Sequence, residues 1–148
     1  MRIVKGIWAG EELASPGKRV RATTEHVRDL WLAYLEPHLD GARVLELFAG
    51  SGALGLEALS RGASSVDLVE NGSEALHALK ANVAARKLRA PEPAAPSGRR
   101  PKSARVFKRD AIPFVRALGV GAYDVALADP PYGSRKLDLV IARWREVR

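Results

Sequence analysis

The stretch Asp129-Pro130-Pro131-Tyr132 places a carboxylate, a backbone acceptor and an aromatic ring within four residues. An exocyclic amine on a nucleobase is a poor nucleophile, because its lone pair is delocalised into the ring. The Asp129 carboxylate and the Pro130 carbonyl can accept the two N–H hydrogens of such an amine and localise the lone pair. The two prolines stiffen the loop and preorganise these acceptors, while Tyr132 can stack on a base. The pattern indicates group transfer to an amine more strongly than a rigid turn with an incidental acid.

A second candidate site is built around closely spaced glycines. The apolar run 44–47 predicts a strand that stops at the tight turn Ala49-Gly50-Ser51-Gly52. Helical spacing follows over 53–60, and a second apolar run, 65–70, ends in the carboxylate of Glu70. A strand, a glycine turn at a helix N-terminus and an acid at the tip of the next strand make a nucleotide-binding half-unit.

The glycine spacing by itself leaves two cofactors open. Gly50, Gly52 and Gly55 satisfy the pattern G-x-G-x-x-G, and Glu70 lies 20 residues after Gly50, as in NAD-binding enzymes. The carboxylate of Glu46, four residues before Gly50, would repel a pyrophosphate and attract a cation. S-adenosylmethionine carries a sulfonium and an ammonium and no phosphate, so the sequence favours it over NAD.

Strands and helices that alternate along the chain must position both sites, and this order predicts a parallel sheet with right-handed crossovers. Asp110 follows the predicted strand 104–108, and Asp129 follows the predicted strand 123–128. The helix that begins after Thr24 should bury an apolar face: Val27, Leu30, Trp31, Tyr34 and Leu35. The last helix should bury another: Leu137, Val140, Ile141, Trp144 and Val147.

Length and composition predict one domain over residues 1–148, with a small hairpin and a helix within residues 1–40. The chain is 47% apolar, but no apolar run approaches the roughly 20 residues of a membrane span. Its start lacks the apolar region of a signal peptide. The absence of cysteine excludes disulfides, thiolate zinc sites and cysteine nucleophiles. The three histidines show no metal-ligand spacing, so we expect a cytoplasmic protein with no metal and no membrane contact.

The net charge of +7 is concentrated in one part of the chain. Residues 86–109 hold nine Lys or Arg side chains against one acid, Glu92. Within them, residues 89–103 contain four prolines and no periodicity, which predicts a flexible basic insertion between a helix and the next strand. Such a segment can bind a phosphate backbone or remain a solvated loop, and both readings stay open. Its position predicts the amino-terminal edge of the sheet, opposite the catalytic end.

Several of these motifs together resemble a known family. Glu46-x-Phe48-x-Gly50-x-Gly52 resembles the first motif of class I methyltransferases, and Asp129-Pro130-Pro131-Tyr132 resembles their amino-methylating motif. The string LELFAGSGALGLEALSRGA, with RIVKG near the start and RATTEHVR before the first helix, resembles the RsmD family of bacterial 16S rRNA guanine-N2 methyltransferases. The resemblance runs from residue 2 to about residue 132. It implies a Rossmann-like α/β fold with a mostly parallel sheet and helices on both faces.

The resemblance also implies an activity and a set of site residues. Methyl transfer from S-adenosylmethionine to guanine N2 would leave S-adenosylhomocysteine, and the substrate would be 16S rRNA or the assembling small subunit. The implied catalytic residues are Asp129, Pro130, Pro131 and Tyr132. The implied cofactor residues are Glu46 at the ammonium, Phe48, Ala49, Gly50, Ser51 and Gly52 at the methionine portion, Glu70 at the ribose, and Asp110 and Ala111 at the adenine. Arg21, Thr23, Thr24 and Arg28 would flank the cofactor and the RNA.

The chain departs from the family pattern at its end and at two positions. Class I methyltransferases add a fifth strand and a final hairpin, so we expect a C-terminally shortened fold whose fourth strand is an exposed apolar edge. The N-terminal hairpin or a second subunit in a dimer would cover that edge, unless the sequence is a truncated product. Glu46 replaces the usual aspartate, and Ala22 a usual proline. Two other functions stay open: a weakly active remnant that binds cofactor or RNA, and an amino-methyltransferase acting on adenine or cytosine in DNA.

Overall fold

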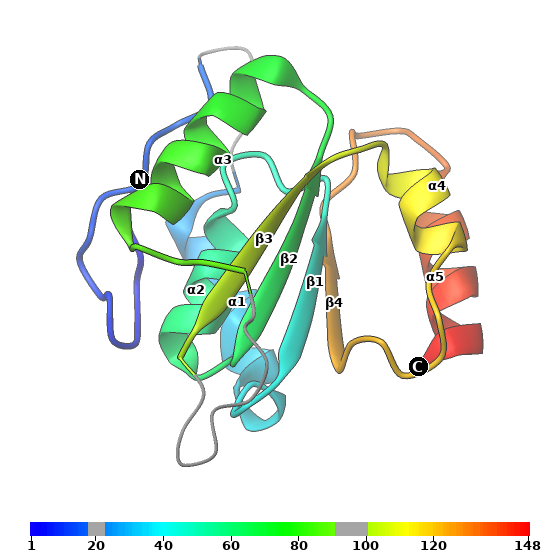
Figure 1. The fold of residues 1–148 in the computed structure, drawn as a ribbon, viewed down its shortest axis with the longest axis horizontal. Coiled ribbons are helices and arrows are strands. Elements are labelled where there is room, and N and C mark those ends of the chain that lie inside the picture. The colour runs from blue at the N-terminus through cyan, green and yellow to red at the C-terminus, as the bar shows by residue number, and fades with distance from the viewer. Residues whose placement is uncertain (18–22, 91–100) are drawn as a thin grey trace.

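A parallel sheet of four strands organises the computed structural model, which describes residues 1–17, 23–90 and 101–148 (Figure 1). The strands are β1 (Arg43–Leu47), β2 (Ser65–Glu70), β3 (Ser103–Lys108) and β4 (Val125–Ala128). They lie in the order β3-β2-β1-β4, and every neighbouring pair is parallel. The parallel sheet predicted from the alternation of strands and helices is therefore confirmed.

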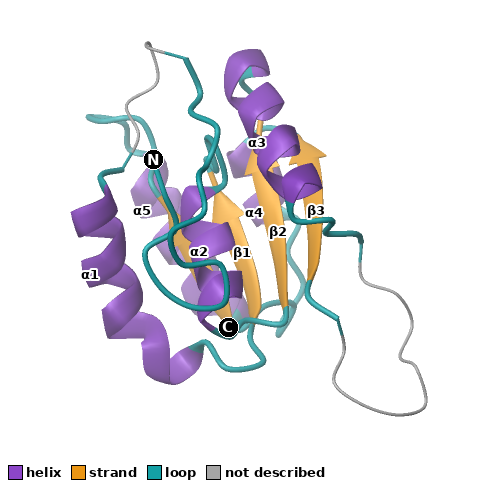
Figure 2. Ribbon diagram, turned by 90° about the vertical axis from the view of Figure 1, so that its left-hand side faces the viewer, coloured by secondary structure: helices purple, strands orange, loops and turns teal. Residues whose placement is uncertain are grey.

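Helices cover both faces of this sheet. They are α1 (Glu25–Leu35), α2 (Ala53–Arg61), α3 (Ser73–Ala85), α4 (Ala111–Arg116) and α5 (Lys136–Val147), with a short 3₁₀ turn η1 (Glu36–His38) after α1. Figure 1 shows α1, α2 and α3 on one face and α4 and α5 on the other, and Figure 2 shows the strands side by side behind the first three helices. This arrangement confirms the predicted Rossmann-like α/β class.

Alternate side chains of the central strand enter two separate cores. Val44 of β1 packs in the core beneath α1, α2 and α3, whereas Leu45 and Leu47 pack in the core beneath α4 and α5. Successive side chains of a strand point to opposite faces, so a strand that is covered on both sides is apolar almost throughout. Glu46 is the buried exception in β1, and it lies on the α2 side of the sheet, where it accepts a hydrogen bond from Gly55 of α2.

The strand order creates a switch point beside β1. The chain runs from β1 outward through β2 to β3 and then returns to place β4 on the opposite side of β1. Leu47 at the end of β1 is in register with Val69 on one side and Ala128 on the other. Open α/β sheets bind ligands at such a point, beyond the carboxyl ends of the strands. The glycine turn that follows β1 and the loop from Asp129 to Tyr132 that follows β4 therefore lie next to one another.

The predicted buried face of α1 is wrong for three of its five residues. Leu30, Trp31 and Tyr34 are 57%, 41% and 84% exposed, and the buried side chains of the helix are instead Arg28 and Leu32. Arg28 is drawn inward because it pairs with Glu57 of α2, and apolar spacing carries no information about such a pair. The α5 prediction fails in the same way at Leu137 and Ile141, which are exposed, although Val140 and Val147 are buried as expected.

The predicted N-terminal hairpin is present as a short antiparallel bridge between Arg2 and Glu12. It packs on α2 and α3: the Ile7 N–H donates to the Ser60 carbonyl at 3.0 Å, and the Ala14 N–H donates to Asn82 Oδ1 at 2.7 Å. The hairpin therefore does not cover β4, which corrects one of the expected coverings. Within the described residues β4 pairs only with β1, and its coverage by a second subunit stays a prediction.

The core of the predicted basic insertion, residues 91–100, lies outside the described residues. Three basic side chains that flank it have partners inside the protein. Arg86 pairs with Glu11, Arg105 pairs with Asp67, and Lys102 donates to the Leu59 carbonyl at the end of α2. These three are therefore structural, and binding of a phosphate backbone by the segment stays a prediction.

In the described part of the chain, no helix has the length and apolarity needed to cross a membrane.

Candidate active site

A cavity of about 940 Å³ lies at the carboxyl ends of the strands, at the switch point. Most of the predicted site residues line it. They are Thr23, Thr24, Glu46, Phe48, Ala49, Gly50, Ser51, Glu70, Asp110, Ala111, Asp129, Pro130, Pro131 and Tyr132. The loops after all four strands and the start of α1 thus converge on one space.

Three predicted residues do not line this cavity within the described structure. Gly52 is the N-cap of α2, and a Cβ on it would lie 2.5 Å from Leu79 Cδ1, so it serves the packing of the turn. Arg28 of α1 is fully buried and its side chain is directed at Glu57 of α2, which corrects its expected position beside the RNA. Arg21 lies outside the described residues.

The turn after β1 has an unusual backbone. Phe48, Gly50 and Gly52 all have positive φ values, of 57°, 57° and 77°, and the Gly52 N–H closes the turn on the Ala49 carbonyl at 2.7 Å. Glycine adopts this region without strain, whereas Phe48 does not. A non-glycine residue held there is a feature that clusters at ligand sites.

Glu70 is locked against this turn by three backbone donors. Its Oε2 accepts from the Gly50 N–H at 2.8 Å, and its Oε1 accepts from Asn71 at 2.9 Å and Gly72 at 2.7 Å. A carboxylate that accepts several N–H bonds is held in one orientation and remains able to accept from further donors. The acid at the tip of β2 is therefore preorganised at the cavity wall.

Glu46 lies deeper, at the end of β1 and under the first turn of α2. Its Oε2 accepts from the Gly55 N–H at 2.9 Å. A Cβ on residue 55 would lie 2.7 Å from that oxygen and 2.7 Å from Val66 Cγ2, so only glycine fits between helix and sheet. Burial, with a smaller contribution from the charge of Glu70, raises the pKa of Glu46 to about 8.

The ends of β3 and β4 supply the remaining polar groups. Asp110 caps α4 by accepting from the Ile112 N–H at 3.1 Å, and its side chain is otherwise exposed at the cavity. Asp129 at the end of β4 accepts a hydrogen bond from the Thr23 hydroxyl at 2.6 Å. Tyr132 is fully exposed, so its ring is available for stacking.

The cavity is acidic although the chain is basic. Among the described residues, five acidic side chains line it, Glu46, Glu70, Glu74, Asp110 and Asp129, against two basic ones, Arg109 and Lys136. The chain as a whole carries a net charge of +7. Such a lining attracts a cationic ligand and repels a dinucleotide pyrophosphate. The arrangement therefore opposes NAD as the cofactor.

The sequence patterns did not indicate several other residues of the lining, among them Trp31, Glu74, Arg109 and Lys136. Trp31 was expected in the core, and only the packing of α1 shows that it faces the cavity. Arg109 directly follows β3 and Lys136 begins α5 just after the loop beyond β4, so the strand-end rule could have found both. The Lys136 ammonium lies 5.7 Å from the centre of the Phe48 ring, within range of a cation–π interaction.

The chain is similar to known proteins over most of its length. The model of a family described as "Conserved hypothetical protein 95" matches residues 1–146. The chain is 34% identical over 147 residues to "Putative rRNA methyltransferase YlbH" of Bacillus subtilis, covering 95% of this chain and 72% of that protein. It is 36% identical over 135 residues to "Ribosomal RNA small subunit methyltransferase D" of Escherichia coli, covering 89% of this chain and 60% of that protein.

A solved structure shows the same fold. "Putative methyltransferase yhhF from Escherichia coli" superimposes with a TM-score of 0.76 at 32% identity, covering 99% of this chain and 72% of that one. The chain thus spans between 60% and 72% of the length of these three proteins.

Proposed function

Because the chain belongs to the RsmD family, described as conserved hypothetical protein 95, we propose that it transfers a methyl group from S-adenosylmethionine to the exocyclic N2 of a guanine in 16S rRNA. The observation that carries this proposal is the acidic cavity at the switch point, with the Asp129-Pro130-Pro131-Tyr132 loop at its rim. The reaction requires a site for a cationic cofactor and a loop that binds the amine. The acidic lining and the Asp129–Tyr132 loop face the same cavity.

The donor set fits S-adenosylmethionine, which supplies an electrophilic methyl group when bound. Glu46 would accept from the ammonium, and the preorganised Glu70 would accept from the ribose hydroxyls. Asp110 and the backbone of Ala111 would hold the adenine. The turn over Phe48 to Gly52 would pass along the methionine portion, where Gly50 has no Cβ to obstruct the approach.

The loop after β4 would orient the guanine amine. The Asp129 carboxylate and the Pro130 carbonyl each accept one N–H, which turns the nitrogen lone pair toward the methyl group. The exposed Tyr132 ring stacks on the base. Placement supplies most of the rate enhancement, and Asp129 takes the proton only as the new N–C bond forms, because the amine becomes acidic at that moment.

Two assays test this function. Tritiated methyl transfer to small subunits that lack the modification, followed by nucleoside analysis, should place the label in N2-methylguanosine. Label in methylated adenosine or cytidine would refute the proposed base, and cofactor binding without any label would favour a remnant that binds but does not react. Calorimetry should detect binding of S-adenosylhomocysteine and no binding of NADH. The opposite result would refute S-adenosylmethionine as the cofactor.

Affinity for the cofactor should rise with pH, because Glu46 is buried. Its pKa of about 8 means that the neutral acid predominates at pH 7 in the ligand-free protein. An ammonium favours the ionised carboxylate, so binding releases a proton. By linkage, calorimetry with S-adenosylhomocysteine should show affinity rising by up to about tenfold per pH unit between roughly pH 5.5 and 7. Glu46→Gln should bind with little pH dependence, and a flat wild-type profile would contradict the assignment.

The proposed partner is 16S rRNA, either free or within the assembling small subunit, and the proposed location is the cytoplasm, where that subunit forms. The dimer that would cover β4 is a separate prediction and is not needed for this reaction.

A further inference from the structure

The carboxylate of Asp129 is held by a residue that lies 106 positions earlier in the chain. Thr23 Oγ1 donates to Asp129 Oδ2 at 2.6 Å, and both residues line the cavity. Within the described residues this is the only hydrogen bond that the Asp129 side chain makes. A donor this close to a charged acceptor makes a strong bond, so it fixes one oxygen of an otherwise exposed carboxylate.

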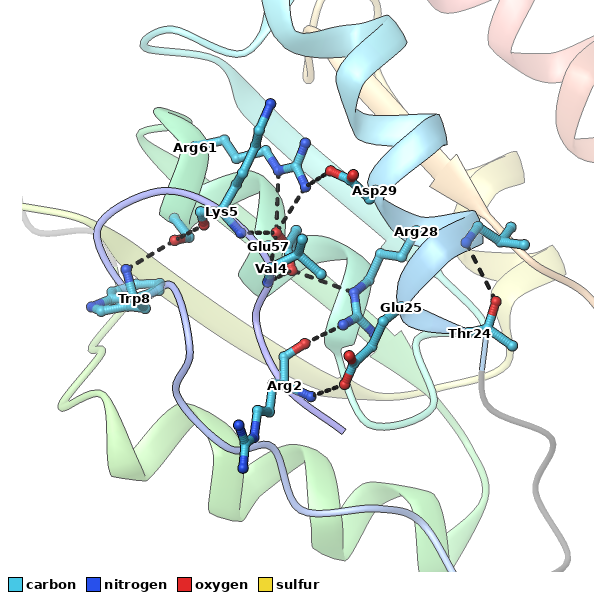
Figure 3. A network of polar contacts seen from close by, with 12 residues as sticks. Arg2, Val4, Lys5, Trp8, Thr24, Glu25, Arg28, Asp29, Glu57 and Arg61 are labelled. Atoms are coloured by element: carbon cyan, nitrogen blue, oxygen red, sulfur yellow. Dashed lines mark hydrogen bonds and ion pairs between the residues drawn. The ribbon is translucent and has the colours of Figure 1, made fainter.

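Thr23 is itself held in place by the packing of α1. The next residue, Thr24, is the N-cap of this helix and accepts from the Val27 N–H at 3.3 Å. One turn further, the fully buried Arg28 reaches Glu57 of α2 at 3.4 Å and also donates to the Arg2 carbonyl (Figure 3). The same Glu57 accepts from the backbone N–H groups of Val4 and Lys5. A buried polar cluster thus anchors the helix that begins directly after Thr23 and Thr24.

This anchor lies on the helix that begins at the glycine turn. Glu57 belongs to α2, whose first residue, Ala53, lines the cavity directly after the turn. The start of α1 is therefore tied to the cofactor side of the cavity through Arg28 and Glu57, and to the amine side through Thr23.

We propose that Thr23 is a positioning residue that orients the Asp129 carboxylate for the incoming amine. With Oδ2 engaged by Thr23, Oδ1 remains to accept from the amine, and rotation of the carboxylate is suppressed. This inference rests on the proposed methyl transfer, and it gives a specific role to Thr23, which was expected to flank the cofactor and the RNA. Because small misplacements of reacting groups cost much of the rate, Thr23→Val should lower kcat by about 10- to 100-fold.

The test compares Thr23→Val with Thr23→Ser, and with Ser64→Ala as a matched loss of a hydroxyl. Ser64 Oγ donates to the Gly41 carbonyl at the amino-terminal ends of the strands, opposite the cavity. We expect Thr23→Val to lower kcat while KM for the subunit and affinity for S-adenosylhomocysteine change by no more than about twofold. Thr23→Ser should restore kcat, and Ser64→Ala should keep it. An unchanged kcat in Thr23→Val, or failure of serine to rescue it, would overturn the proposal.

A spectroscopic readout separates this proposal from the proposed function. The ¹³C resonance of the Asp129 carboxyl carbon should shift in Thr23→Val and return in Thr23→Ser, whether or not methyl transfer is detected. Thermal melting should be nearly unchanged in Thr23→Val but lowered by roughly 3 °C in Thr24→Val, which removes the helix cap. No shift of the carbon resonance would refute the contact itself. A shift without any transfer by the wild-type protein would refute the proposed function and leave the contact standing.

Discussion

Asp129→Ala should abolish methyl transfer while leaving cofactor affinity almost intact. The substitution removes the acceptor that orients the amine, and electrostatic or proton-accepting groups of this kind typically contribute at least ~100-fold to the rate. Glu46 and Glu70, which would hold the cofactor, extend from β1 and β2 and make no hydrogen bond to Asp129. Single-turnover methyl transfer and calorimetry with S-adenosylhomocysteine measure the two effects separately.

A matched control lies at the other end of the same strand. Asp124 precedes β4 and pairs with Arg43 at 3.0 Å, at the amino-terminal edge of the sheet and away from the cavity. Asp124→Ala removes the same carboxylate chemistry from the same element, and it should keep the transfer rate within about twofold. Equal loss of transfer and cofactor binding in Asp129→Ala would show that Asp129 supports the cofactor site instead of the amine.

Glu57→Ala should destabilise the protein by about 3–5 kcal/mol, the cost of leaving a buried charge without its partner. Glu57 is fully buried and contacts both Arg28 and Arg61, with Nη2 of Arg61 at 2.9 Å (Figure 3). It also accepts from the Val4 and Lys5 N–H groups, at 2.9 Å and 2.8 Å. Its removal would therefore leave the buried Arg28 without a carboxylate partner, leave Arg61 with Asp29 alone, and leave two backbone donors unpaired. Urea unfolding at pH 7 measures the difference in free energy.

Glu36→Ala is the control for this prediction, because it removes a carboxylate that also contacts Lys5. The Glu36–Lys5 pair spans 3.7 Å and is about half exposed on both sides. Exposed pairs of this kind contribute less than about 1 kcal/mol. If Glu57→Ala were no more destabilising than Glu36→Ala, the cluster would not be the anchor of α1, and the support for Thr23 would be lost with it.

Much of the candidate site followed from local properties of the sequence. Glycine spacing and apolar runs located the turn at Gly50 and the acid at Glu70, and both line the cavity. The rule that ligands bind beyond the carboxyl ends of parallel strands located Asp110 and Asp129, which also line the cavity. In each case the deciding feature is a run of neighbouring residues, and the carboxyl ends of parallel strands must meet at one edge.

Periodicity failed where burial depends on charge. The spacing of Leu30, Trp31 and Tyr34 indicated a buried face, yet these side chains are exposed and Arg28 is inside. A hydrophobic pattern assigns every arginine to solvent, because an isolated buried charge is costly. The acceptor that removes this cost, Glu57, lies on another helix, and no local pattern pairs the two residues.

Local patterns were therefore enough to predict the class of fold, the order of its elements and the acids that end its strands, because these depend on neighbours along the chain. Long-range packing, in contrast, makes Arg28 a buried anchor rather than an RNA ligand and brings Thr23 to Asp129. Those contacts join residues that are 29 and 106 positions apart. They exist only once α1 packs against α2 and the start of α1 meets the end of β4.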